Sequence, residues 1–512
     1  MEQIITFEHL TIEPYKVEKI LDIQIQHKIN EHSTLYIRAL LSDDVKDNYI
    51  KECIQGSKVG LKLRNSEKND VLFYGMVKDI ELEVVQGSYY MILYAVSYSY
   101  LLDVEKKNRS FQNKQKTYVS LENEIMEVYS KAMISDVASK KKELGKFIVQ
   151  YQETDWEFLK RLASHFHTGL VNDVHIDKIK CYFGIPNNAT HTINSFNYSI
   201  KKDLGKYLML SQNGIDGIIE QDVAYYEVES ETPVNIGDTI VFHGKELYVY
   251  QINARMCKGI LQFNLILSTP KGMSQLFQMH NNIVGVSLDA KICEIKNDRV
   301  KVSLQIDEES GHVQEKKCYF PYSTIYSSKD GSGWYCMPEK GDSVRIYFPD
   351  GIEEHSYAIS SVHDEVDDNL SGSADNLSEV GSPGGGNNGG YSGKRDDPSV
   401  KSLRNPSGKE IRLTPDGIYI ISNGTTITLT DEDGVSVVSD QNIEFKSDKN
   451  IIIGAEQDVS IVGLSGVDLN CKDIAAVKIN DNVEVIGQEV KANLNFDTYN
   501  SLTPNWYYKV LR

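Results

Sequence analysis

An apolar pair, with one residue between its two members, returns every eight positions in the stretch GVSVVSDQNIEFKSDKNIIIGAEQDVSIVG at residues 434–463. In an extended strand both members of such a pair point to the same face, whereas a helix would scatter them around its axis. The segments between the pairs, such as SDQN and SDKN, have the composition of turns. The repeat therefore predicts short strands joined by tight corners. Together with the flanking repeats, the predicted core positions are Ile427, Leu429, Val435, Val437, Ile443, Phe445, Ile451, Ile453, Val459, Ile461, Val467 and Leu469.

A single ribbon of this kind cannot bury its own apolar side chains, and its strand edges would lack hydrogen-bond partners. Three copies wound around a common axis would bury the pairs and satisfy the edges. The repeat therefore favours an intertwined triple-stranded β-helix in a homotrimer. A monomeric solenoid with three repeats per coil is the alternative, but it would contain only about two or three coils, close to the minimum for a repeat stack.

Length and composition limit the class of protein. The chain has 512 residues, of which 40% are apolar, which is enough for several domains with real cores. The N-terminal sequence has no basic segment followed by an apolar one, and no apolar run reaches about 18 residues. We therefore expect that the chain has no signal peptide and that it is made in the cytoplasm. The seven cysteines are dispersed and form no CxxC pair, which predicts neither a disulfide framework nor a zinc site.

The net charge of the chain is -19, and no block is rich in Lys or Arg. Binding to nucleic acid requires clustered positive charge that displaces counterions from phosphates. The charge therefore argues against nucleic acid as a partner, and against an anionic membrane surface for the same reason.

Most of the chain before residue 365 has the pattern of short strands separated by turn residues, so we predict a mainly β, multidomain fold. Residues 1–105 predict a barrel or sandwich, residues 215–267 a second small barrel, and residues 285–363 a five-stranded OB-like barrel. A segment rich in Gly, Ser, Asn and Asp follows, and its composition is typical of a flexible linker or exposed loop.

Two helices are predicted between the first two barrels. In SLENEIMEVYSKAM one side is apolar, and in ETDWEFLKRLASHF Thr154 precedes Glu157 by three positions, the spacing of a capping box. The residues expected on the apolar sides are Leu121, Ile125, Val128, Tyr129 and Ala132 in the first helix and Phe158, Leu159, Leu162 and Phe166 in the second.

Three motifs in the chain resemble a known family. VQYQETDWEFLKRLASHF looks like the signature helix of the VgrG spike proteins of type VI secretion and of the related central hubs of contractile phage tails, and CYFGIP at residues 181–186 is in keeping with that hub region. Residues 299–363 resemble the OB domain of the same family, including the turns at Pro338, Gly341 with Asp342, and Asp350 with Gly351. The eight-residue repeats resemble its triple-stranded β-helix.

The resemblance implies a homotrimer in which two hub barrels per chain match a threefold spike to a sixfold tube. It also implies OB domains that form a collar, and a needle driven through the target cell envelope on firing. Inner tube and baseplate proteins are the implied partners. The expected divisions are a hub with two β-barrels and inserted helices at 1–270, an OB-fold domain at 280–365, a linker or loop at 366–404, the triple-stranded β-helix spike at 405–490 and a tip tail at 491–512.

The sequence contains only weak signals for a catalytic, cofactor or metal site. GGGNNGG at residues 384–390 fits a dinucleotide motif, but it follows no predicted strand and opens no helix. His165 and His167 lie two apart on a predicted helix and point in different directions, so they cannot share a metal. Two pairs of adjacent carboxylates, Glu308 with Glu309 and Glu353 with Glu354, lie in predicted turns. We interpret them as solvent-exposed side chains and not as the acid and base of a glycosidase. We therefore expect no catalytic, cofactor or metal site and no enzymatic activity.

The end of the chain carries three aromatic residues, Trp506, Tyr507 and Tyr508. They are candidate docking residues for a separate tip-capping protein, because aromatic side chains anchor interfaces. The alternative is that the tail seals the core of its own needle. No histidine follows His363, so the His-x-His iron site of some family tips is absent from this sequence.

The sequence thus predicts a mechanical hub and spike of a contractile injection system. Phage tail, bacteriocin, secretion system and extracellular injector all fit. One rival hypothesis is a spike that carries a wall-degrading activity, which would call for an extra domain after the needle. Another is a receptor-binding β-helical fibre, which would call for a C-terminal head.

Overall fold

The computed structural model describes residues 4–44, 48–64, 71–193, 195, 197–314, 316–328, 336–362 and 399–462. The chain divides into two compact units, Met1–Leu377 and Ser378–Arg512, and each is described by itself. None of the helices in these residues is both long enough and apolar enough to cross a membrane.

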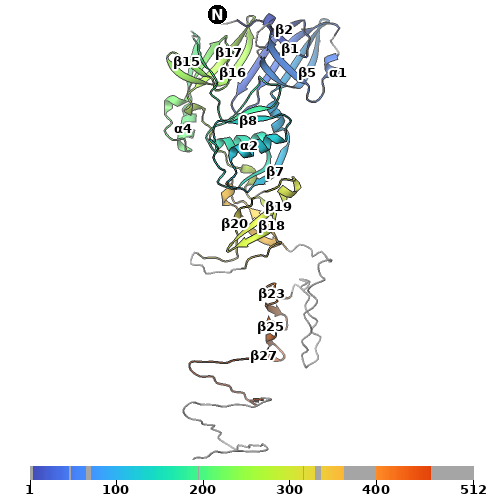
Figure 1. Ribbon diagram of the computed structural model, residues 1–512, viewed down its shortest axis with the longest axis vertical. Coiled ribbons are helices and arrows are strands. Elements are labelled where there is room, and N and C mark those ends of the chain that lie inside the picture. The colour runs from blue at the N-terminus through green and yellow to red at the C-terminus, as the bar shows by residue number, and fades with distance from the viewer. Residues whose placement is uncertain are drawn as a thin grey trace, which may run out of the picture. The chain divides into compact units, whose positions relative to one another are not determined.

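The first unit contains a 12-stranded sheet, formed by two stretches of the chain that flank a middle module (Figure 1). Its strand order is β1-β4-β5-β6-β3-β2-β16-β17-β14-β13, and β12 and β15 branch from β16. The strands are β1 (Leu10–Glu13), β2 (Lys19–Lys28), β3 (Thr34–Leu41), β4 (Lys58–Leu63), β5 (Val71–Val85), β6 (Ser88–Val96), β12 (Thr190–Thr192), β13 (Tyr198–Lys202), β14 (Ala224–Ser230), β15 (Thr239–Phe242), β16 (Lys245–Cys257) and β17 (Ile260–Ser268).

The two predicted barrels are therefore parts of one sheet. Gln251 to Arg255 of β16 pair antiparallel with Lys28 to Gln24 of β2, which joins the two halves edge to edge. The expected two hub β-barrels are not seen as closed barrels: β2 and β16 each use an edge for the partner half, and the strand pairings of the described residues close neither half. Alternating residues such as Leu35, Ile37, Ala39 and Leu41 of β3 face a shared core.

The middle module lies between the 12-stranded sheet and a five-stranded sheet in Figure 1. Its own core surrounds two helices, and the apolar stripe predicted for the second helix is buried at Phe158, Leu159 and Leu162. The first helix ends at Glu127, so Val128 lies beyond it and is exposed, contrary to the prediction. The elements are η2 (Tyr98–Asp103), β7 (Lys106–Phe111), α2 (Tyr118–Glu127), β8 (Met133–Asp136), β9 (Ile148–Thr154), α3 (Asp155–Ser164), β10 (Leu170–Asn172) and β11 (Lys180–Phe183).

The five-stranded sheet has the order β20-β19-β18-β21-β22. A parallel bridge between Tyr322 and Ala358 brings the two ends of this order together, as in a partly open five-stranded barrel. The expected OB-like topology is present in these residues. The strands are β18 (Ser287–Lys296), β19 (Arg299–Leu304), β20 (Tyr319–Pro321), β21 (Ser343–Tyr347) and β22 (Tyr357–Val362).

Short helices precede or connect the strands of the first unit. They are η1 (Phe7–His9), α1 (Asn48–Glu52), α4 (Leu204–Gln212), η3 (Glu220–Val223), η4 (Lys271–Met273), η5 (Asn281–Ile283), α5 (Gln305–Glu309) and η6 (Glu353–His355).

The second unit is an antiparallel meander, in which each strand pairs with the next along the chain. Its strands are β23 (Lys401–Arg404), β24 (Glu410–Thr414), β25 (Gly417–Ser422), β26 (Thr425–Thr430) and β27 (Gly434–Ser439). From Asp440 to Val462 the described chain forms no helix and no strand. The absence of a helix agrees with the repeat, while the strands predicted in these octads are not formed within one chain.

A buried acid in the middle module breaks the apolar pattern of α2. Glu122 is fully buried, and neither of its carboxylate oxygens has a hydrogen-bond partner in the described part of the chain. Burial, aided by the charge of Asp136, raises the pKa of Glu122 from 4.5 to about 8. The folded protein therefore keeps a proton that the unfolded chain loses near the ordinary pKa.

We predict that the stability of this module falls as pH rises from about 4.5 to about 8, because over this range the folded state binds more protons at Glu122 than the unfolded state. Glu122→Gln should flatten this dependence and raise the thermal midpoint above that of the parent protein at alkaline pH. Glu127→Gln, on the exposed side of the same helix, is the control. Parallel pH profiles for the parent and Glu122→Gln would contradict the assignment.

Candidate functional site

The start of α3 is fixed by the predicted capping box. The Thr154 hydroxyl accepts a hydrogen bond from the Glu157 backbone N–H at 3.1 Å, and the Glu157 carboxylate accepts one from the Thr154 N–H at 3.0 Å. Two of the free N–H groups at the helix start are satisfied in this way. The capping box is confirmed, and it sets the position of α3 against β9.

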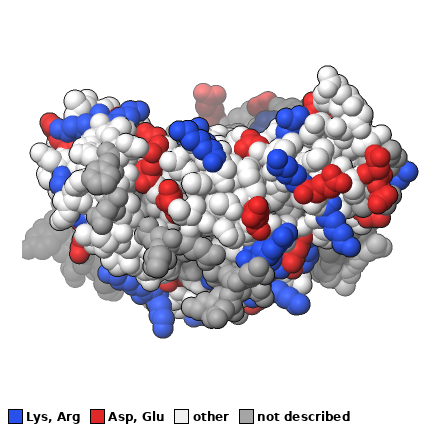
Figure 2. All heavy atoms as spheres, turned by 90° about the horizontal axis from the view of Figure 1, so that it is seen from above, with Lys and Arg blue, Asp and Glu red and all other residues white. Residues whose placement is uncertain are grey.

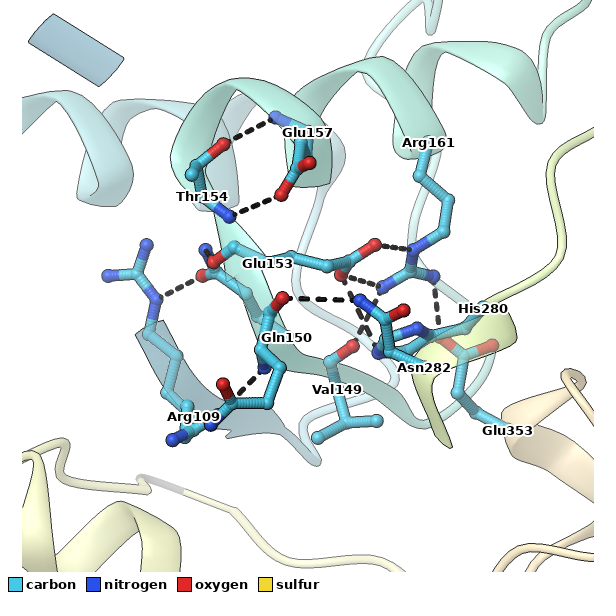
Figure 3. A network of polar contacts seen from close by, with 12 residues as sticks. Arg109, Val149, Gln150, Glu153, Thr154, Glu157, Arg161, His280, Asn282 and Glu353 are labelled. Atoms are coloured by element: carbon cyan, nitrogen blue, oxygen red, sulfur yellow. Dashed lines mark hydrogen bonds and ion pairs between the residues drawn. The ribbon is translucent and has the colours of Figure 1, made fainter. Parts of the chain in front are cut away.

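Arg161, in the last turn of α3, holds two modules together (Figure 3). Its Nε and Nη2 donate to the two carboxylate oxygens of Glu153 at 2.8 and 2.9 Å, and its Nη1 donates to Glu353 Oε1 at 2.7 Å. Nη2 also donates to the Val149 carbonyl at 2.7 Å. Glu153 and Val149 belong to the middle module, whereas Glu353 belongs to η6 beside the five-stranded sheet. We call this group the Arg161 junction.

All three charged side chains of the junction are buried, with exposed fractions of 3% for Arg161, 6% for Glu153 and 3% for Glu353. Burial raises the pKa of Glu153, although the guanidinium of Arg161 works against this shift. Because the guanidinium donates to both carboxylates and to a carbonyl, protein groups compensate its charge.

The segment that leads to the five-stranded sheet passes next to the junction. His280 is 1% exposed, and its Nε2 lies 3.5 Å from Glu153 Oε2 without forming a hydrogen bond. Burial and the charge of Arg161 lower the pKa of His280 to about 3, so the ring is neutral at physiological pH. Its backbone N–H donates to Gly351 O at 3.0 Å, and a Cβ at Gly351 would lie 3.0 Å from Met279 Cβ. Glycine at this turn permits the close approach.

A second polar contact and an apolar one reinforce the junction. Asp307 of α5 accepts hydrogen bonds from both the backbone N–H and the hydroxyl of Ser110 in β7, each at 2.6 Å. Phe147, which precedes β9, packs with ring centroids 5.0 Å from Phe320 and 6.1 Å from Phe348 of the five-stranded module. The two modules therefore share a core as well as a buried ion network.

The expectation that Glu353 and Glu354 form a solvated turn is wrong for Glu353. Only Glu354 is exposed, because Glu353 turns inward to Arg161. Glu308 and Glu309 are exposed, as expected, but they lie in the helix α5 and not in a turn. His165 stacks on Phe277, and His167 Nδ1 lies 3.2 Å from the Gln275 carbonyl, so each imidazole has its own surroundings.

The register of the second unit brings several predicted needle residues together. Ile427 of β26 pairs with Val437 of β27, and Leu429 pairs with Val435. Ile420 and Ile418 of β25 continue the same two rows on the other side of β26. Since directly paired residues share one face of a sheet, the meander carries two apolar rows on one face.

These apolar rows are largely uncovered. Val435 is 71% exposed, and the remaining predicted positions up to residue 461 are at least partly exposed. The uncovered positions beyond the meander are Ile443, Phe445, Ile451, Ile453, Val459 and Ile461. Val467, Leu469, Trp506, Tyr507 and Tyr508 lie outside the described residues, as does most of the predicted linker at 366–404.

A family match falls in the N-terminal third of the chain. Residues 27–166, which include most of the first sheet half and the Arg161 end of the middle module, match the family of phage tail baseplate hubs (GPD). The resemblance to VgrG-like hub and spike proteins is confirmed by this match together with the fold. No curated protein sequence matches the chain.

Among solved structures, the chain is similar to the Escherichia coli c3393 protein, described as a component of the type VI secretion system with structural similarity to the T4 bacteriophage tail proteins gp27 and gp5. The two are 13% identical over 69% of this chain and 99% of that one, with a TM-score of 0.52. A Neisseria meningitidis tail protein matches 52% of this chain and 98% of its own at 10% identity and a TM-score of 0.39. A chain of the half-lidded Francisella PdpA-VgrG complex is 8% identical to this chain, over 84% of this chain and 87% of that one, with a TM-score of 0.49.

We predict that Glu353→Ala destabilises the first unit, because it leaves Arg161 buried with one carboxylate fewer. The loss should lie near the lower end of the ~3–5 kcal/mol typical of a broken buried ion pair, since Glu153 remains bound. The matched control is Glu354→Ala, one residue along and exposed, which should change stability by less than about 0.5 kcal/mol. Urea unfolding measures both changes, and equal midpoints for the two variants would exclude a structural role for the junction.

Proposed function

We propose that this chain is the structural hub and envelope-puncturing spike at the tip of the tube of a contractile injection system, acting as a homotrimer. The first unit would form the hub that meets the inner tube and baseplate proteins, and the second unit would begin the needle. The proposed role is mechanical and assigns no catalysis to the chain. The observation that carries it is the hub family match at residues 27–166 within a hub-like fold.

The second unit supports the trimeric part of the proposal. A soluble monomer rarely leaves a long contiguous apolar face in water. Here the two apolar rows of the meander and the apolar pairs between Ile443 and Ile461 are largely exposed within the described chain. Two further copies would bury these rows along a common axis and would supply strand partners for residues 440–462.

The Arg161 junction supports the mechanical part. A spike must transmit an axial load from hub to needle without bending between modules. A shared apolar core and a guanidinium bound to two modules resist such bending, because any opening would expose a buried charge.

We predict that the protein is a trimer in analytical ultracentrifugation and that Ile453→Asp disrupts it, because three carboxylates would meet on the axis without partners. Asp448→Ala, five residues earlier and exposed, should leave the trimer intact. A stable, folded monomer of the unmodified protein at micromolar concentration would overturn the proposed function.

A further inference from the structure

A cavity of about 510 Å³ lies beside the strand pair that joins the two halves of the 12-stranded sheet. Strands from both halves and the start of the loop after β10 contribute to its lining. The buried apolar side chains that line it include Ile25 of β2, Leu72 of β5, Val234, Ile252 and Ala254 of β16, and Phe263 of β17. Sites for small molecules commonly have this size and a mostly apolar wall.

A histidine of this lining interrupts the apolar inward face of β2. Ile23, Ile25 and His27 alternate along the strand, and His27 pairs with Ile252 of β16 where the two halves meet. Burial lowers the pKa of His27 to about 3, so the ring is neutral at physiological pH. A neutral imidazole has one donor nitrogen and one acceptor nitrogen, and each needs a partner when it is removed from water.

The neighbours of His27 decide which nitrogen carries the proton. Asn172 Nδ2 donates to the Glu31 carbonyl at 2.8 Å, so Asn172 presents its Oδ1 to Ser33. The Ser33 hydroxyl donates its one proton to this oxygen at 2.6 Å, and it must therefore accept from His27 Nδ1, which is 2.7 Å away. The remaining nitrogen, Nε2, is an acceptor, and it receives no hydrogen bond from the described part of the chain.

The charges of the lining limit what the cavity can hold. Acidic and basic side chains are interspersed over the face of the sheet seen from above (Figure 2). Among the described residues that line the cavity, by contrast, Asp173 has the only carboxylate and there is no lysine or arginine. Burial would raise the pKa of Asp173, but hydrogen bonds from His175 and from Lys180 Nζ, the latter at 2.7 Å, lower it below its usual value. A cationic ligand would have to compete with Lys180, and an anionic ligand would face the carboxylate.

We propose that this cavity binds a small uncharged molecule that has an apolar body and a hydroxyl group, and that the hydroxyl donates to His27 Nε2. The apolar body packs against the aliphatic wall, and the hydroxyl supplies the partner that the histidine lacks. Because the wall comes from both halves of the sheet, a bound ligand also stabilises the pairing of β2 with β16. The site lies within one chain and is independent of the proposed spike function.

Isothermal titration calorimetry on the full-length protein tests the site with two isomeric probes. The first, n-octanol, has a hydroxyl, whereas heptyl methyl ether has the same atoms and no donor. We expect n-octanol to bind and the ether to bind about tenfold more weakly, because the ether leaves His27 Nε2 without a partner. Octanoate should also bind about tenfold more weakly, because its charge would be removed from water beside Asp173. No binding of n-octanol, or equal affinity for n-octanol and either of the other probes, would overturn the proposal.

The variant His27→Phe identifies the acceptor. It should remove the preference for n-octanol over the ether, because the phenyl ring keeps the apolar contacts and has no acceptor. Asn235→Ala, at an exposed position of the same lining, is the control and should keep the preference. A preference that survives in His27→Phe would overturn the assignment of the hydrogen bond.

A second variant locates the ligand without changing the histidine. Ala254→Leu adds volume to the buried wall and should weaken the binding of both isomers. Circular dichroism of each variant checks that it remains folded. Unchanged affinities in folded Ala254→Leu would show that the probes bind elsewhere, and the proposal would fail.

Discussion

The arrangement of two modules in the first unit depends on a permanently charged guanidinium that is buried at the end of α3. Arg161 is stable there only while Glu153, Glu353 and the Val149 carbonyl all accept from it. These acceptors come from two modules, so neither module can move without exposing or orphaning a charge. The capping box at Thr154 and the packing of Phe147 help to position this network, because they hold α3 and β9 where the guanidinium can reach both carboxylates.

The second unit differs from the first because its apolar side chains are not covered within the described chain. Its strands satisfy their hydrogen bonds with neighbours in the same chain, but its apolar rows at Ile427 with Val437 and Leu429 with Val435 find no cover there. The first unit buries its apolar side chains within one chain, whereas the second unit leaves its apolar rows largely exposed. The proposed spike, which must be rigid within each copy and joined between copies, would require both arrangements.

Local patterns in the sequence predicted local structure well. Strand periodicity predicted the strand-rich character of residues 1–105, and the spacing of Thr154 and Glu157 predicted the start of α3, because both depend on neighbours in the chain. Long-range partners were not predictable from such patterns. Glu353 read as a solvated acid because its partner Arg161 is 192 positions away. The joining of the two sheet halves was missed because the pattern of β2 is the same whether it lies at an edge or beside β16. The buried Glu122 carried no signal that separates it from the exposed acids of its helix.

The pairing of β2 with β16 also has a consequence for synthesis on the ribosome. Residue 28 meets residue 251, so the partner edge emerges about 220 residues after β2 has left the exit tunnel. At roughly 5–20 residues per second, β2 waits on the order of ten seconds or more with one row of backbone groups unpaired. During that time many ribosomes on one message hold identical waiting edges near one another. Rapid translation of the middle module would therefore shorten the period in which nascent copies can pair wrongly.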